Sequence, residues 1–263
     1  MLNLSPIQLT IILSLFTFLI TALGGAIVFF FKKINKTCMQ LILSFSAGVM
    51  VASSFFSLIL VAIEQSESKG QNPALICTVG ILLGILFIIL MENFVDKKLN
   101  KSKYLSKYIN ENNRQSVLSV IAISLHNIPE GMCIGVAFAG AQLVGVTDAI
   151  ISAILLAFGI GVQNFPEGAS VSLPLYNAGF KKSTSFLFSV LSGIVEPIFA
   201  VIGFYCASIV SSILPLFLTF SAGTMIAVSC TELLPESFLD NKKIATLGFG
   251  LGFCFMMLLD LLL

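Results

Sequence analysis

The feature that most constrains this chain is a set of eight long apolar segments. They lie near residues 7–31, 39–63, 73–91, 116–142, 148–174, 183–206, 213–235 and 244–262. A helix needs about 20 apolar residues to cross the hydrocarbon core of a bilayer. Only 10% of the residues are charged, whereas soluble domains carry about 25%. The sequence therefore predicts an all-α integral membrane protein with one transmembrane domain over residues 1–263, and it excludes nucleic-acid-binding proteins and soluble enzymes.

The basic residues predict the orientation of the eight spans. If both termini are extracytoplasmic, the cytoplasmic connections hold 13 of the 14 Lys and Arg residues: Lys32, Lys33, Lys36, Lys97, Lys98, Lys101, Lys103, Lys107, Arg114, Lys181, Lys182, Lys242 and Lys243. Only Lys69 would lie outside. Cytoplasmic loops of membrane proteins carry an excess of Lys and Arg. We therefore expect both termini outside and a cytoplasmic Lys-rich loop at about 92–115.

Two pairs of similar segments indicate internal repeats. FSAGVMVASS at 45–54 matches FSAGTMIAVS at 220–229 in seven of ten positions, and HNIPEG at 126–131 resembles QNFPEG at 163–168. The members of each pair fall in spans that run in opposite directions. Many transporters use repeats of inverted topology to place a binding site between two halves. We expect such repeats here, with spans 1–3 and 6–8 around spans 4–5; chance recurrence of small residues at helix contacts is the alternative.

Four carboxylates and the only histidine lie well inside the predicted spans: Glu130, Glu167, Glu196, Glu232 and His126. No Lys or Arg lies within any of these spans to neutralise them. A charged group at the centre of a membrane helix costs about 2.5–3.5 kcal/mol. These carboxylates must therefore be protonated, hydrated in a cavity or paired with a bound cation. Ionisable residues at such depth are functional by default.

The spacing of these residues favours a metal site. His126 and Glu130 are four residues apart and share one helix face, and Gln163 and Glu167 repeat this arrangement. A proline before each glutamate removes an amide donor and frees a backbone carbonyl. Imidazole, amide and carboxylate groups together suit one or two divalent transition metals. The predicted ligands from the two motifs are His126, Asn127, Glu130, Gln163, Asn164 and Glu167.

Four further residues are candidates for the site or its approach. Glu196 would be contributed by a third helix, and Glu232 lies near the cytoplasmic end of the seventh span. Met50 and Met225 occupy corresponding positions of the longer repeat and could line a metal path with soft thioethers. The alternatives are an isolated protonated carboxyl for Glu196, a wetted helix end for Glu232 and core filling for the two methionines.

Three other functions share some of these features. An aquaporin-like or cation-selective channel could use the two N-x-P segments, but a water pore excludes the cations that paired glutamates attract. An intramembrane metalloprotease typically needs HExxH, whereas Asn127 follows His126 here. A proton-coupled transporter of another small substrate would usually anchor it with a cationic or helix-end group, and the spans contain no Lys or Arg.

The paired motifs resemble those of a known family. Eight spans with H-N-x-P-E-G at 126–131 followed by N-x-P-E-G at 164–168 are similar to the ZIP (Zrt/Irt-like) family of divalent metal transporters. The resemblance covers essentially the whole chain. The Gln163-Asn164 pair and the ELLPE segment at 232–236 resemble the bacterial GufA-like branch most.

The resemblance implies a role for each candidate residue. One metal position would be formed by His126, Glu130, Gln163 and Glu167. A second would be completed by Asn127, Asn164 and Glu196, with Glu130 and Glu167 bridging the two ions. Met50 would lie on the outer approach, and Met225 and Glu232 toward the cytoplasmic exit.

The resemblance also implies the activity. Members of the family import zinc, and often iron, manganese or cadmium, into the cytoplasm, and we expect the same here across the plasma membrane. The favoured mechanism is elevator-type sliding of a bundle that contains spans 4 and 5. The metal is then the substrate rather than a tightly bound cofactor, no enzymatic activity is expected, and a homodimer is compatible with the family.

Two departures from the family pattern bear on selectivity. Many members have a histidine where this chain has Gln163, so one nitrogen ligand becomes an amide oxygen. This change should weaken the preference for soft metals. Many members also carry a His-rich loop between spans 3 and 4, whereas residues 92–115 contain no histidine. We therefore expect no metal capture by that loop.

Overall fold

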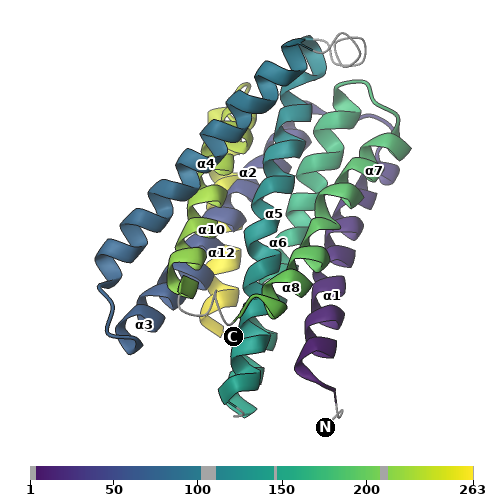
Figure 1. Cartoon of the computed structure of the whole chain (residues 1–263). Coiled ribbons are helices and arrows are strands. Elements are labelled where there is room, and N and C mark those ends of the chain that lie inside the picture. Colours follow the sequence, from purple (N-terminus) through teal and green to yellow (C-terminus); the bar gives the residue numbers. More distant parts are fainter. Residues whose placement is uncertain (1–3, 102–110, 145–146, 208–212, 263) are drawn as a thin grey trace.

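The computed structural model describes residues 4–101, 111–144, 147–207 and 213–262, and the regular elements in these ranges are all helices. Eight helical stretches are long and apolar enough to cross a membrane: Pro6–Phe30, Lys36–Ser68, Pro73–Phe94, Ser119–Gln142, Asp148–Asn177, Lys182–Tyr205, Leu214–Ser237 and Lys242–Leu262. The eight predicted spans are thereby confirmed. Helix α1 begins and helix α12 ends at the same end of the bundle (Figure 1), which follows from an even number of spans.

Five spans each contain one long α-helix: α1 (Pro6–Ala26, continued by the 3-10 turn η1, Ile27–Phe30), α4 (Pro73–Lys101), α5 (Glu111–Val144), α6 (Thr147–Asn177) and α12 (Lys242–Leu262). The other three spans are interrupted. They comprise α2 (Lys36–Ser53), the π-helical turn η2 (Ser54–Ile59) and α3 (Leu60–Ser68); α7 (Lys182–Gly193) and α8 (Val195–Tyr205); and α10 (Leu214–Val228), the π-helical turn η5 (Ser229–Leu233) and α11 (Leu234–Ser237).

The interruptions occur at informative positions. The two π-helical turns begin at Ser54 and Ser229, which are the last residues of the two FSAG segments and therefore correspond in the repeat. Short π-helical turns inside α-helices are frequent at functional sites. The sixth span breaks at Ile194. Glu196 consequently lies in the first turn of α8, where the positive end of the helix dipole favours a carboxylate.

Both ends of the predicted Lys-rich loop at 92–115 are helical instead. Helix α4 continues to Lys101 and α5 begins at Glu111, while residues 102–110 lie outside the described part of the chain. Lys, Glu, Gln and Arg are good helix formers even where no apolar face is present. Such residues can extend a helix into water beyond the lipid. The end of the apolar segment therefore did not coincide with the end of the helix.

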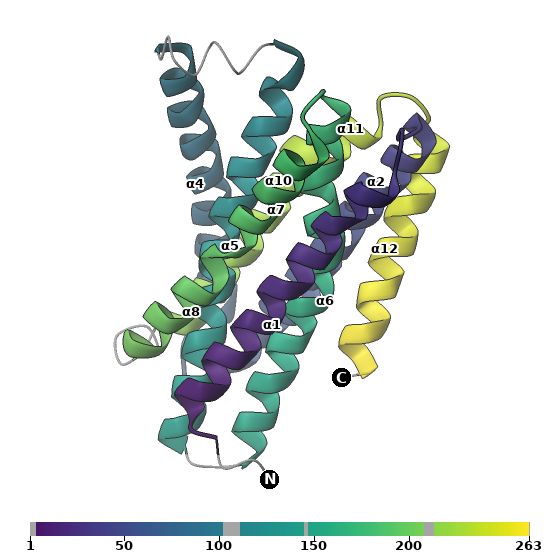
Figure 2. The ribbon, with the colours of Figure 1, turned by 90° about the vertical axis from the view of Figure 1, so that its right-hand side faces the viewer.

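The helices pack as four close pairs: α1 on α6, α5 on α8, α2 on α12 and α4 on α10. The first two pairs and α7 form one group, which we call the first helix group; α2, α3, α4, α10 and α12 form the second helix group (Figures 1 and 2). The two groups meet mainly where α2 packs on α6 and α10 packs on α5. The helices that carry the two N-x-P-E-G motifs are therefore at the boundary between the groups.

Glycines allow the closest helix approaches in the first group. Gly131 of α5 lies against the backbone carbonyl of Glu196, and Gly168 of α6 lies against that of Thr21. A side chain at either position would collide with that backbone. The final glycine of each motif thus brings a neighbouring helix beside the glutamate that precedes it.

Candidate metal centre

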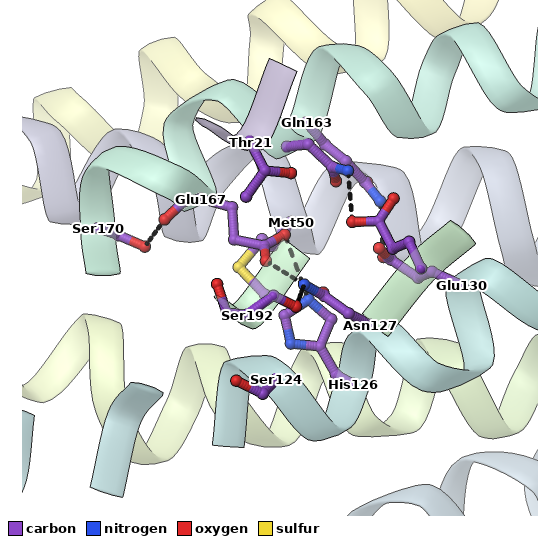
Figure 3. A network of polar contacts seen from close by, with 12 residues as sticks. Thr21, Met50, Ser124, His126, Asn127, Glu130, Gln163, Glu167, Ser170 and Ser192 are labelled. Carbon is purple, nitrogen blue, oxygen red and sulfur yellow. Dashed lines mark hydrogen bonds and ion pairs between the residues drawn. The ribbon is translucent and has the colours of Figure 1, made fainter. Parts of the chain in front are cut away.

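A cluster of buried polar side chains lies where α5, α6 and α8 meet (Figure 3). The structure brings together all seven central residues that the sequence singled out: His126, Asn127 and Glu130 of α5, Gln163, Asn164 and Glu167 of α6, and Glu196 of α8. Each of these residues is at most 1% exposed. A polar group buried this deeply is expensive unless it finds a partner, so the contacts within the cluster decide what it can do.

Three of the residues converge on one point. Single ligand atoms of His126, Glu130 and Glu167 all lie within 4.8 Å of one another. The Nε2 atom of His126 is 3.4 Å from Oε2 of Glu167. One imidazole and two carboxylates at this separation form a set of donors for a divalent cation such as zinc, which accepts both nitrogen and oxygen ligands.

The three amide side chains orient the three carboxylates. Each amide nitrogen donates a hydrogen bond to a carboxylate on another helix: Gln163 Nε2 to Glu130 Oε1 at 2.6 Å, Asn164 Nδ2 to Glu196 Oε1 at 2.8 Å, and Asn127 Nδ2 to Glu167 Oε1 at 2.9 Å. Each amide oxygen is left pointing elsewhere. The hydrogen bonds therefore hold one oxygen of every carboxylate and leave the amide oxygens free to coordinate.

Six of the seven residues keep buried polar atoms that have no hydrogen-bond partner. These atoms are Nδ1 and Nε2 of His126, Oδ1 of Asn127, Oε2 of Glu130, Oε1 of Gln163, Oδ1 of Asn164 and Oε2 of Glu196. A buried polar atom left unpaired costs about 1–3 kcal/mol. Five of these seven atoms are oxygen acceptors gathered in one place, which is a surplus that one or two metal cations would satisfy.

Two backbone carbonyls that the sequence reasoning missed fix the asparagines. Asn127 Nδ2 also donates to the carbonyl oxygen of Ser192 at 3.1 Å, and Asn164 Nδ2 donates to that of Thr17 at 3.4 Å. Ser192 and Thr17 are separated by 175 residues, the same offset that relates the two FSAG segments. The equivalent asparagine of each motif thus contacts an equivalent position of α7 or α1.

The same offset was a usable signal in the sequence. It relates Thr10, Ser14, Thr17 and Thr21 of the first span to Ser185, Ser189, Ser192 and Glu196 of the sixth. All eight residues are fully buried. Glu196 and Thr21 therefore occupy corresponding positions, and the acidic residue of the cluster has a neutral counterpart in the other half.

The remaining predicted residues lie farther from the seven central ones or in the core. Met50 of α2 is buried and is drawn beside the cluster in Figure 3. Met225 of α10 is fully buried in the main apolar core. The carboxylate of Glu232 accepts a hydrogen bond from the Ser119 hydroxyl of α5. Ser119 precedes His126 by seven residues, about 10 Å along the helix, so Glu232 lies toward the end of the bundle where α5 begins.

A second polar region lies in a cavity of about 540 Å³ at the opposite end of the bundle, where the chain termini are found. Its walls come from η2, α3, α5, α6, α10 and α12 and include Ser57, Glu64 and Asp260. Ser57 donates a hydrogen bond to Asp260 Oδ1 at 2.7 Å. Oδ2 of Asp260 is buried without a partner.

Comparison with known proteins agrees with this geometry. The ZIP Zinc transporter family model matches residues 7–117 and 97–260. "Zinc transporter ZIP11" of Homo sapiens is 31% identical over 93% of this chain and 94% of its own length. "Zinc transporter ZupT" of Clostridium perfringens is 33% identical over 89% of this chain and 88% of its own. "Zinc transporter GufA" of Myxococcus xanthus is 31% identical over 92% and 93%. This multi-pass membrane protein belongs to the ZIP zinc transporter family.

Proposed function

We propose that this protein imports zinc, and other divalent transition metals such as cadmium, iron and manganese, across the plasma membrane into the cytoplasm. The observation that carries the proposal is the group of unpaired oxygen and imidazole nitrogen atoms buried where α5, α6 and α8 meet. A cation-selective channel is not favoured, because the cluster is fully buried. A fully buried cluster suits an ion that is bound and then released by a conformational change.

Two adjacent metal positions account for the contacts. The first would use His126, Glu130, Gln163 and Glu167; the second would use Asn127, Asn164 and Glu196 with the same two bridging glutamates. The free amide oxygens of Asn127, Gln163 and Asn164 support this division, since each could turn toward an ion without breaking its helix. One imidazole among oxygen ligands would accept zinc and would also tolerate harder metals such as manganese.

The described surroundings suggest a route through the molecule. The cavity that contains Ser57 and Asp260 would admit metal from the extracytoplasmic side. Met50 would lie between this cavity and the two metal positions. Met225 and Glu232 would line the path to the cytoplasm, where Glu232 is within hydrogen-bonding reach of Ser119.

An elevator-type movement is the mechanism we propose for release. The first helix group contributes the seven central residues. Met50 and Met225 belong to the second, and Glu232 lies in η5, which continues α10 of that group. The contacts between the groups are fewer than those within the helix pairs. Sliding of the first group against the second would therefore carry the bound metal between the two membrane faces, and a homodimer would keep the second group stationary.

The test is metal flux into proteoliposomes containing the purified protein. We expect saturable uptake of zinc or another transition metal, but not of magnesium, from a panel that also includes cadmium, iron(II), manganese and cobalt. Glu167→Gln should abolish the uptake because it removes a bridging carboxylate. Glu67→Gln, a matched change at an exposed glutamate of α3, should transport normally. Absence of metal flux in the folded wild-type protein, or equal flux in all three proteins, would contradict the proposal.

A further inference from the structure

A groove of about 340 Å³ is lined by η1, which continues α1, and by α6 of the first helix group, and by α2 and α12 of the second. The described residues that line it are all apolar or glycine and include Ile27, Leu41, Phe45, Phe165, Ala169 and Leu251. Leu41, Phe165 and Leu251 are 37%, 43% and 55% exposed. The groove is therefore open at its rim and buried at its floor, where Ala169 is only 2% exposed.

The groove lies inside the membrane-spanning part of four helices. Cavities with apolar walls do not hold water. At this depth the surrounding solvent is the hydrocarbon of the bilayer. A hydrocarbon chain is consequently the ligand whose chemistry matches the walls.

Positive charge gathers at the membrane face nearest the groove. Lys36 begins α2 five residues before Leu41, which is about 7.5 Å along the helix. Lys242 and Lys243 begin α12 at the same end of the bundle, and all three lysines are exposed. Lys36 lies 3.3 Å from a carboxylate oxygen of Asp240. Lysines close to the membrane surface attract anionic lipid headgroups.

We propose that the groove binds one acyl chain of an anionic phospholipid whose phosphate lies beside Lys36, Lys242 and Lys243. The groove walls come from both helix groups, so the bound chain packs between them. Phe165 and Pro166, which line the groove, lie in the sequence between Asn164 and Glu167 of the polar cluster. The lipid site is thus separated from the candidate metal centre by the thickness of one helix.

The test is photo-crosslinking of the full-length protein in vesicles. The vesicles contain either phosphatidylglycerol or phosphatidylcholine with a diazirine in one acyl chain, and labelled residues are mapped by peptide mass spectrometry. Labelling of the groove should exceed several-fold that of Leu82 and Leu86, which are 60% and 50% exposed on the lipid-facing side of α4. Phosphatidylglycerol should label the groove more than phosphatidylcholine does.

Two variants fill the groove from opposite walls. Ala169→Leu places a larger side chain in the groove from α6. Leu251→Phe does so from α12, where Leu251 is exposed and the larger ring can be accommodated without a clash. Each should reduce groove labelling to the level of α4 and leave α4 labelling unchanged. Replacing Lys36, Lys242 and Lys243 together by glutamine should remove the preference for phosphatidylglycerol, whereas Lys69→Gln at the other end of the bundle should not.

Three outcomes would overturn the proposal. The first is groove labelling no stronger than that of α4. The second is labelling that persists at full strength in folded Leu251→Phe protein. The third is efficient disulfide formation between two copies of a Leu41→Cys variant, which would show that a second chain covers the groove.

Discussion

The α5 motif and the α6 motif share a backbone framework but differ in chemistry. Each motif uses its asparagine to contact a carbonyl of an equivalent neighbour, Ser192 for α5 and Thr17 for α6. Each also ends in a glycine that lies against another helix. The repeat therefore accounts for how the two glutamates come to face each other.

The differences between the motifs decide what the cluster can bind. His126 of α5 corresponds to Gln163 of α6, and Glu196 beside α5 corresponds to Thr21 beside α6. The imidazole approaches the carboxylate of Glu167, whereas the Gln163 amide donates a hydrogen bond to that of Glu130. The backbone contacts of the two motifs are thus equivalent, but their side chains differ. Two metal positions built from them would therefore have different ligands.

The largest effect is expected from the residues that the two motifs share. Glu130→Gln and Glu167→Gln should each weaken zinc binding by more than about 100-fold, because loss of a ligand should exceed the effect of losing an outer partner. Isothermal titration of purified protein with zinc measures this loss. Unchanged affinity in both variants would contradict bridging by the two glutamates.

The second-largest effect is expected from a substitution that gives α8 the residue found at the corresponding position of α1. Glu196→Thr copies the residue found at Thr21 and removes the carboxylate that the first metal position does not use. We expect the metal content to fall from two ions to one per chain, with the first position retained, and native mass spectrometry counts the ions directly. Retention of two ions, or loss of both, would show that Glu196 does not distinguish the positions.

A smaller change is expected from exchanging the first residue of the α6 motif. Gln163→His adds a second imidazole and should raise the preference for zinc over manganese by about tenfold, equivalent to roughly 1.4 kcal/mol. Competition between the two metals during uptake measures the ratio. A ratio that does not move, in a variant that still transports, would mean that Gln163 does not contact the metal.

The smallest effect is expected at Thr21, the neutral counterpart of Glu196. Within the described part of the chain, its hydroxyl donates to the carbonyl of Thr17 in its own helix, at 3.2 Å. Thr21→Val should therefore leave metal flux unchanged and reduce stability by no more than about 1.5 kcal/mol. Thermal unfolding in detergent and flux in proteoliposomes test the two parts, and a strong loss of flux would assign Thr21 a role in transport.

The sequence by itself determined the number of spans and singled out the seven residues that we propose as metal ligands. Hydropathy reports directly which segments can lie in lipid, because each apolar run must match the thickness of the bilayer. The four-residue spacing of His126 and Glu130 places both on one face of a helix whatever its neighbours are. These properties depend on local sequence, and the eight helical spans confirm the first of them.

Only the tertiary structure decided how these faces meet and which atoms remain unpaired. The hydrogen bonds from asparagines to the carbonyls of Thr17 and Ser192 and the groove between the helix groups each require helices distant in sequence to approach. The hydropathy pattern also did not predict that α4 continues to Lys101 or that α5 begins at Glu111, because polar helix formers continue a helix beyond the lipid. Close contact between helices depends on side-chain shape and backbone position in three dimensions, which the pattern along one chain does not specify.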